Sequence, residues 1–303
     1  MSRDFTYTTL ASLLETLSHR GFSFSTLHNI AASSPSEARV IILRHDVEDD
    51  YNKALTFARI EHSLGIMGSY YFRLFPVAGN DRIISQIAAL GHEVGYHYDD
   101  LSVCNGRYEA AIARFARNVD HLRQFGAVTT ITMEGAPRSR FDNRMLWLGR
   151  IDKELKARGS HPVNLEAEGQ LSRSQRLPDF YYHLPANHSK LPHYDYQDFG
   201  ITTEPYFDLD FNQFFYLTDT GRCWDGWNVS VRDKVPQQSE WEKQGLVFHT
   251  SAQIIRAANE GRLPEKIMMT FHPQRWNNNQ VLWLKELILQ RLKNVVKRGL
   301  VRF

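Results

Sequence analysis

The sequence predicts an α/β protein built on a parallel sheet, and it favours a closed or nearly closed (β/α) barrel over an open, doubly wound sheet. Short apolar runs alternate along the chain with longer stretches in which apolar residues recur at helical spacing. This alternation is typical of βαβ units, whose strands lie parallel in one sheet. The strands number seven or eight when one more is placed in the irregular middle of the chain, and that number suits a barrel.

The expected strands are runs of aliphatic and aromatic residues with little polar alternation, as in strands that are buried on both faces. They cover residues 40–43, 68–72, 93–96, 129–133, 214–217, 246–248 and 267–271.

Helices are expected between the strands wherever apolar residues recur every three or four positions. The first covers residues 51–65, and Asp49 and Asp50 precede it as candidate capping residues. Two more cover residues 81–91 and 108–126, and each of the three ends at a glycine, which is a common helix stop.

The ends of the chain and its middle complete the predicted organisation. A helical extension covers about residues 8–19, and a C-terminal helix begins near Gln280 and is expected to pack on the barrel with a basic face in solvent. Residues 160–213 are rich in Pro, His and Tyr and keep no regular period, so we expect an ordered insertion there. With no internal repeat and no linker, residues 1–303 are predicted to form one domain.

Composition and charge exclude several classes of protein. The chain has 36 Lys and Arg against 34 Asp and Glu, without the basic stripe or tail of a nucleic-acid-binding protein. Two cysteines, Cys104 and Cys223, exclude a disulfide scaffold and a zinc site built mainly from thiolates. No apolar run approaches the roughly 20 residues of a membrane span, and the first 30 residues lack a signal-peptide pattern. We therefore expect a soluble, cytoplasmic protein.

Charged and imidazole side chains directly follow several of the expected strands. In a parallel barrel the carboxyl ends of all strands lie on one face, where such folds place their active sites. We therefore expect a functional site among these residues. They are Arg44, His45, Asp46, Glu48, Arg73, His97, Asp99, Asp100, Glu134, Asp219, His249 and His272.

The residue types at the strand ends indicate metal-assisted hydrolysis. Carboxylates (Asp46, Glu48) and imidazoles (His97, His272) without a thiolate suit a divalent ion, and zinc is the usual choice for mixed nitrogen and oxygen ligands. The glycine-rich phosphate-binding loops and the Gly-x-Ser-x-Gly nucleophile motif are absent. A carboxylate base and a histidine acid are the proton carriers that remain.

Three motifs in this order resemble the polysaccharide deacetylase-like superfamily, the carbohydrate esterase family four and its relatives. They are Leu43-Arg44-His45-Asp46-Val47-Glu48, Gly91-His92-Glu93-Val94-Gly95-Tyr96-His97 and Thr270-Phe271-His272-Pro273. The resemblance covers about residues 38–275 and implies a distorted (β/α)7 barrel, a divalent metal ion, and removal of acyl groups from amino sugars or cleavage of related C–N bonds.

Further motifs are similar to an uncharacterised bacterial branch of this superfamily. They are Gly135-x-Pro137, Phe141-Asp142-Asn143-Arg144, Tyr194-Asp195-Tyr196, Asp219-Thr220-Gly221-Arg222 and His272-Pro273-Gln274-Arg275-Trp276. Proteins of this branch are often associated with surface-polysaccharide gene clusters, which implies a carbohydrate or sugar-nucleotide substrate.

The resemblance implies roles for the first motif in two alternative ways. In the preferred one, Asp46 is the general base and Glu48 is a metal ligand, which keeps both roles on carboxylates. In the other, His45 is the base and Asp46 is a metal ligand. Both are consistent with the residues.

The remaining motifs imply a metal site with one family ligand missing. His97 matches the first histidine ligand, but Leu101 stands where the family has the second. Asp99, Asp100 or His92 are candidates to replace it. On the fourth strand Glu134 departs from the family pattern, and a glutamate there can bind a hard ion or act as a base. His272 matches the general acid of the family.

Substrate-binding residues are expected around the last strand. Trp224 and Trp276 are candidates to stack on sugar rings, and Arg275 and, more weakly, Arg222 are candidates to bind an anionic group of the substrate. Three evenly spaced histidines in the insertion, His183, His188 and His193, are expected to be ordinary loop residues because no carboxylate accompanies them.

These observations predict a metal-dependent hydrolase that removes an acyl group from an acylated amino sugar or sugar nucleotide. Two alternatives remain open. One is another C–N hydrolase of the same fold, and the other is a non-catalytic carbohydrate-binding or scaffold protein that kept the barrel and lost the metal. Asp46, His97 and His272 together favour the enzyme, whereas Leu101 favours the scaffold. The sequence gives no oligomeric state.

Overall fold

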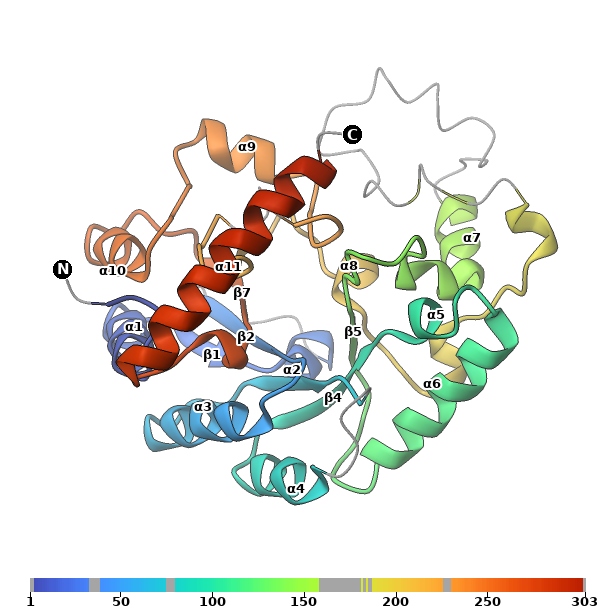
Figure 1. Ribbon diagram of the computed structural model, residues 1–303, viewed down its shortest axis with the longest axis horizontal. Coiled ribbons are helices and arrows are strands. Elements are labelled where there is room, and N and C mark those ends of the chain that lie inside the picture. Colours follow the sequence, from blue (N-terminus) through green and yellow to red (C-terminus); the bar gives the residue numbers. More distant parts are fainter. Residues whose placement is uncertain are drawn as a thin grey trace.

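The computed structural model describes residues 3–32, 39–74, 80–157, 181, 184, 187–225 and 230–301. Seven parallel strands form one sheet, which curls with helices packed around its outside (Figure 1). The strands are β1 (Ser23–Ser25), β2 (Val40–Val47), β3 (Ser69–Phe72), β4 (Glu93–Tyr98), β5 (Ile131–Met133), β6 (Phe215–Thr218) and β7 (Lys266–Phe271).

The sheet has the order β5-β4-β3-β2-β7-β6, with β1 paired to β2 off this path. β2 is the longest strand, and every residue in it is buried. It pairs with β7 on one side, and on the other side with β1 along residues 40–42 and with β3 along residues 44–47. The parallel α/β architecture predicted from the sequence is therefore confirmed.

The closure of the barrel is only partial. Among the described residues, β5 and β6 end the sheet and do not pair with each other, so the sheet is a curled half-barrel that is compatible with a distorted barrel. The segment around Thr203 lies at the open edge of β5, because an isolated parallel bridge joins Thr203 to Thr130 and the Ile131 N–H donates to the Thr203 carbonyl. Irregular chain thus occupies the place where a closed barrel would have its next strand.

Helices follow most of the strands, as expected for βαβ units. The α-helices are α1 (Tyr7–His19), α2 (Leu27–Ala32), α3 (Tyr51–Ser63), α4 (Asp81–Ala89), α5 (Asp100–Val103), α6 (Tyr108–Leu122), α7 (Leu148–Ala157), α8 (Pro205–Asp208), α9 (Gln238–Lys243), α10 (Ser251–Asn259) and α11 (Gln280–Val301). Short 3-10 helices are η1 (Asn143–Trp147), η5 (His188–Lys190), η6 (Tyr196–Phe199) and η8 (Pro273–Arg275).

Two local predictions are wrong. Residues 246–248 form no strand and lead instead into α10, whose start is fixed by a reciprocal capping box between Thr250 and Gln253. Phe248 is buried there by ring packing against Phe215, which explains its apolar character without a strand. At the start of α3, Asp50 occupies the N-cap position, but its side chain makes no capping hydrogen bond.

The expected insertion contains ordered structure in its described part. Residues 187–213 hold η5, η6 and α8, and the Tyr196 ring packs on Trp147 and Phe207. Gly200 ends η6 with φ 72°, a left-handed conformation that glycine adopts without steric cost. Most of residues 160–186 lie outside the described part of the chain.

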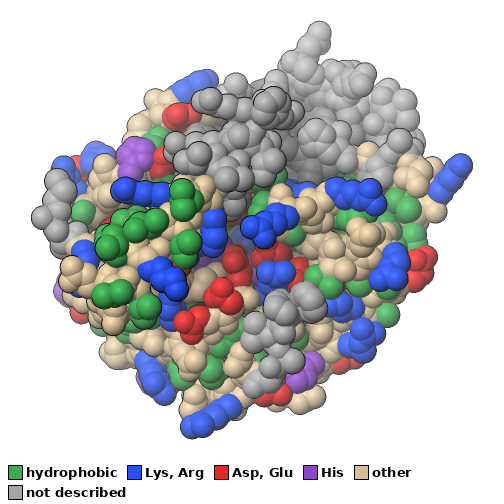
Figure 2. All heavy atoms as spheres, in the orientation of Figure 1, with side chains coloured by type: hydrophobic (Ala, Val, Ile, Leu, Met, Phe, Trp, Pro, Cys, Tyr) green, Lys and Arg blue, Asp and Glu red, His purple; other side chains and the backbone are tan. Residues whose placement is uncertain are grey.

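Helix α11 keeps its described basic side chains, Lys285, Arg291 and Lys293, in solvent as predicted. Most of its apolar side chains, however, do not face the protein as an amphipathic helix predicts. Its inward contacts are polar: the Trp283 indole N–H donates to the Asp4 carbonyl, Gln290 is buried, and the Asn294 side chain donates to the Gly221 carbonyl. Apolar side chains lie exposed on its outer side, and Figure 2 shows hydrophobic groups over this helix. They are Val281, Leu282, Leu284, Ile288, Leu289 and Leu292. Within the described residues, α11 and the other helices fall short of the combination of length and apolarity needed to cross a membrane.

Candidate metal centre

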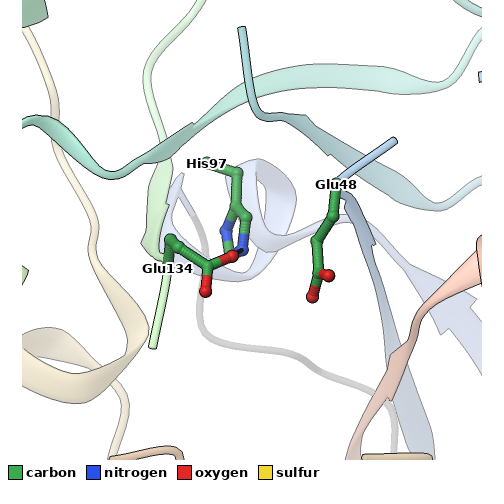
Figure 3. A group of neighbouring side chains, drawn as sticks. All are labelled: Glu48, His97 and Glu134. Atoms are coloured by element: carbon green, nitrogen blue, oxygen red, sulfur yellow. Dashed lines mark ion pairs between the residues drawn. The ribbon is translucent and has the colours of Figure 1, made fainter. Parts of the chain in front are cut away.

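Three side chains from the carboxyl ends of three strands converge at the centre of the curled sheet. Glu48 follows β2, His97 lies near the end of β4, and Glu134 follows β5. One ligand atom from each lies within 4.8 Å of the others. Figure 3 shows the Glu134 carboxylate against the His97 ring, with the Glu48 carboxylate directed toward them from another strand. His97 and Glu134 are buried and Glu48 is half-buried, so the cluster has one side open to solvent.

His97 is held so that one ring nitrogen faces the cluster. Its Nδ1 lies 2.9 Å from the Thr132 hydroxyl, which is its register neighbour on β5. Its Nε2 therefore points to Glu134 Oε2, 3.3 Å away. Burial lowers the pKa of His97, but the carboxylates of Asp46 and Glu134 outweigh it and hold this pKa above its ordinary value. A histidine fixed through its second nitrogen in this way is typical of metal ligands.

Glu134 offers the cluster an acceptor that the described protein leaves without a hydrogen-bond donor. Its Oε1 accepts from the Ala136 N–H at 2.7 Å, and the left-handed backbone of Ala136, with φ 37°, turns that N–H back toward the carboxylate. Its Oε2 is buried and makes no hydrogen bond with good geometry. Burial raises the pKa of Glu134, but His97 and then Arg73 outweigh it, and the pKa lies well below its ordinary value. An ionised and buried oxygen whose near neighbour is the ring nitrogen of another candidate ligand fits a cation, so Glu48, His97 and Glu134 are a suitable ligand set for a divalent metal.

Asp46 lies beside the cluster but does not belong to it. Arg44 donates to both of its carboxylate oxygens, through Nε at 2.9 Å and Nη2 at 2.8 Å, and both side chains are buried. Burial raises the pKa of Asp46, but Arg44, His97 and His272 outweigh it and lower this pKa below its ordinary value. The prediction that Asp46 binds the metal is not supported, because the group of ligand atoms that lie within 4.8 Å of one another contains Glu134 and not Asp46.

His45 does not reach the site, so the alternative with His45 as base is wrong. Side chains alternate between the two faces of a strand, and Arg44 and Asp46 face the pocket while His45 faces the helices. His45 is fully buried, stacks on Tyr70 with ring centroids 4.1 Å apart, and places Nε2 2.7 Å from Glu61 Oε1.

The residues considered as substitutes for the missing histidine ligand also lie elsewhere. His92 directly precedes β4 and so lies at the amino end of this strand, away from the cluster. Its Nε2 is 2.9 Å from the Ala58 carbonyl oxygen. Asp99 pairs with Arg73 and Arg114, and Asp100 pairs with the same Arg114. The predicted replacement of the family ligand by one of these three residues is therefore wrong.

His272 and Asp219 form a second element of the site. His272 Nδ1 lies 2.5 Å from Asp219 Oδ1, while Asp219 Oδ2 accepts the His272 backbone N–H at 3.0 Å and the Trp276 indole N–H at 2.6 Å. His272 Nε2 consequently faces the pocket, 3.4 Å from Glu48 Oε1. Burial raises the pKa of Asp219, but His272 and Arg275 outweigh it and keep the carboxyl ionised. The sequence placed Asp219 at a strand end but gave it no role, and its orienting contact with His272 appears only in the fold.

The candidate substrate-binding residues divide into one that lines the pocket and three that do not. Arg275 lines it, with Nη2 3.8 Å from Glu48 Oε1. Trp276 and Trp224 are buried in the core, where the Trp224 indole donates to Ser251, so they are not accessible for stacking on a sugar. Arg222 donates to the Trp283 carbonyl of α11 and is also away from the pocket. The predictions for these three residues are wrong, because the two tryptophans are buried in the core and Arg222 contacts α11.

The remaining strand-end and insertion histidines lie outside the cluster. His249 pairs with Asp225 on the surface at 3.1 Å, and His193 pairs with Asp152 at 2.6 Å. His188 is half-buried in η5, and His183 lies outside the described residues.

The cluster opens into a pocket of about 440 Å³, including its mouth. Figure 2 shows acidic side chains at the centre of this face with Lys and Arg around them. Besides the residues already described, its wall includes Met133, Gly135, Pro137, Thr220, Ser230, Val231, Arg232 and Asp233.

Comparisons with known protein families, with curated proteins and with solved structures gave no match for this chain. The resemblance to polysaccharide deacetylases therefore stays a prediction from the motifs.

A buried glutamate behind the site gives a pH-dependent prediction for stability. Glu204 is fully buried and accepts from the Tyr206 N–H, and burial raises its pKa to about 8 against the opposing effect of Arg44 and Arg144. The native state thus keeps a proton that the unfolded chain loses above its ordinary pKa, so this group lowers the free energy of unfolding as the pH rises toward 8. In Glu204→Gln, which keeps the acceptor, we expect this loss to disappear. Relative to wild type the variant should gain about 1.4 kcal/mol per pH unit between pH 5 and 7.

Urea unfolding of both proteins at pH 5, 6 and 7 tests this prediction, because other titrating groups contribute equally to both. Parallel pH profiles of wild type and Glu204→Gln would contradict it.

Proposed function

We propose that the protein is a metal-dependent hydrolase that removes an acyl group from an acylated amino sugar or sugar nucleotide. The observation that carries the proposal is the convergence of Glu48, His97 and Glu134, with ligand atoms within 4.8 Å, beside a histidine oriented by a buried carboxylate. Such an arrangement combines a site for a Lewis acid with a proton carrier, which are the two requirements of metal-assisted amide or ester hydrolysis. The motifs that resemble polysaccharide deacetylases give the substrate class.

The proposed ligands are Glu48, His97 through Nε2, and Glu134 through Oε2. A bound divalent ion, with zinc the usual choice for such ligands, supplies polarisation of the acyl carbonyl and stabilisation of negative charge on its oxygen. Thr132 keeps the His97 ring in the ligating orientation through its Nδ1.

Asp46 and His272 are the proposed proton carriers. Asp46 stays ionised beside Arg44 and faces the pocket, so it accepts the proton of the attacking water, as the sequence predicted. His272 Nε2 faces the same pocket and donates a proton to the leaving amine or alcohol. Asp219 holds His272 in the orientation that exposes Nε2 and stabilises its positive charge. Arg275 is placed to bind an anionic part of the substrate near Glu48.

Metal content by elemental mass spectrometry tests the ligand set. After incubation with divalent ions we expect about one equivalent in the wild type. We expect less than about a tenth of that in His97→Ala and Glu134→Gln, because each removes one of three protein ligands. His249→Ala is the matched control, because His249 also pairs with a carboxylate but on the surface.

Wild-type protein that takes up no divalent ion would overturn the metallohydrolase proposal. Equal metal content in His97→Ala and wild type would mean that the metal binds at a site other than the one proposed. With metal bound, release of acetate from acetylated amino sugars and sugar nucleotides is the activity to measure.

A further inference from the structure

We infer that a second pocket beside the candidate metal centre binds a phosphate-bearing part of the substrate, such as the diphosphate of a sugar nucleotide. The pocket, called the basic pocket here, is lined by Tyr108, Arg140, Phe141, Arg144, Arg232 and Lys234 among others. This inference rests on the proposed function for the reaction, but the binding it predicts can be measured without turnover.

The basic pocket adjoins the metal-centre pocket and shares part of its wall. Val231 and Arg232 line both. Arg232 stands between them because its guanidinium donates to the carbonyls of Gly135, Ala136 and Ser139, each at 2.7 Å. A substrate that reaches Glu134 with its acyl group therefore extends past Arg232 into the basic pocket. The space there, about 1520 Å³ with its mouth, exceeds that of the metal-centre pocket.

The charge of the basic pocket favours an anion. Four cationic side chains line it against the single carboxylate of Asp142. Asp142 pairs with Arg144 at 2.6 Å and lies 3.6 Å from Arg232, so its charge is already balanced. Arg140 and Lys234 make no ion pair in the part of the chain that the structure describes. Two cations without carboxylate partners, at the mouth of a pocket, are suited to phosphate oxygens.

Aromatic groups in the same pocket favour a ligand with a flat ring next to its phosphates. The Phe141 ring lies against Gly106, where a Cβ would approach the ring to 2.2 Å, so only glycine permits this position. The guanidinium of Arg140 lies over the same ring, 4.8 Å from its centroid. Tyr108 is mostly buried, and burial raises its pKa to about 12, so its hydroxyl remains a neutral donor. A nucleobase or second sugar can pack on such a wall, whereas a free phosphate makes no use of it.

Isothermal titration with uridine diphosphate, pyrophosphate, uridine and glucuronate tests the inference, in buffer with EDTA so that metal does not bridge the phosphates. We expect uridine diphosphate to bind the wild type more tightly than uridine and glucuronate do. Arg140→Gln and Lys234→Gln should each weaken its binding about tenfold or more, since each removes a charged hydrogen-bond donor. Arg138→Gln removes an exposed cation outside the pocket and should leave binding unchanged.

The inference would be overturned if uridine diphosphate bound no better than uridine. It would also be overturned if uridine diphosphate bound equally well to the wild type and to the two single variants, Arg140→Gln and Lys234→Gln. Tighter binding of glucuronate than of uridine diphosphate would overturn the assignment of phosphate in favour of a uronate. If pyrophosphate bound as tightly as uridine diphosphate, the aromatic side chains would contribute nothing to binding, and that part of the inference would be wrong. Glu134→Gln separates the two proposals, because it should lose metal and keep uridine diphosphate; failure of the metal experiment alone therefore leaves the basic pocket standing.

Discussion

Asp219→Asn is expected to lower the kcat of the proposed hydrolase by about 10²- to 10⁴-fold, the range typical of losing an effective general acid. Metal content should be unchanged, because Asp219 contacts none of the three proposed ligands except through His272. The variant therefore separates proton transfer from metal binding. Steady-state kinetics on an acetylated sugar nucleotide, with metal content measured on the same preparation, gives both quantities.

The size of the effect follows from the hydrogen bonds of the carboxylate. Asp219 accepts from His272 Nδ1 through one oxygen, and from the Trp276 indole and the His272 backbone through the other. Asparagine has one acceptor oxygen and an amide that donates, so one of these donors faces another donor. It also removes the negative charge that stabilises a protonated His272.

Asp81→Asn is the matched control for this experiment. Asp81 also pairs with a histidine, His121, at 2.9 Å, but both side chains are exposed and lie on helices α4 and α6 away from the pocket. We expect it to retain full activity. If folded Asp219→Asn kept activity within about threefold of wild type, His272 would not depend on this carboxylate and its role as general acid would fail.

The sequence predicted the elements that repeat and missed those that depend on distant contacts. Strands β2 to β7 were each predicted within a few residues, because each is an apolar run followed by a polar group, whereas β1 was not among the expected strands. The apolar residues 246–248 carry the same signal, but they pack under α10 against Phe215. A short apolar run does not reveal whether its partner is a strand or a ring from elsewhere in the chain.

The site could be located from the sequence, but the roles of its residues could not all be assigned. Polar residues at strand ends predicted the face, and Glu48, His97, Glu134 and His272 meet there. In β2, buried on both faces, the choice between His45 and Asp46 needs the direction of each side chain, which no local pattern gives.

The apolar and cationic residues near His272 were harder to interpret for the same reason. Trp276 packs on Phe5, whose carbonyl accepts the Asn277 N–H, so the N-terminal segment covers the ring. Arg222 is likewise covered by α11. These contacts join residues more than 60 positions apart, and periodicity along the chain contains no information about them.

Arg44→Met is expected to lower the free energy of unfolding by about 3–5 kcal/mol, the usual cost of leaving one member of a buried ion pair without its partner. Arg44 is 2% exposed, and the carboxylate of Asp46 beside it is equally buried. Without the guanidinium, the described residues leave Asp46 a 3.4 Å contact from the Thr132 hydroxyl and the more distant rings of His97 and His272. Chemical denaturation with urea at pH 7 measures the loss.

The double variant Arg44→Met/Asp46→Leu shows whether the loss comes from the unpaired charge or from packing. Replacing both members of a buried pair by apolar side chains is often neutral, so we expect the double variant to recover most of the stability lost in Arg44→Met. A loss below about 1 kcal/mol in Arg44→Met would contradict this prediction and would mean that Asp46 loses its charge at little cost once Arg44 is absent. A double variant no more stable than Arg44→Met would attribute the effect to the packing of the Arg44 stem, which lies with its guanidinium 5.6 Å from the Tyr206 ring. The two variants together therefore measure how strongly Arg44 stabilises the charge of Asp46, on which the proposed catalytic role of Asp46 depends.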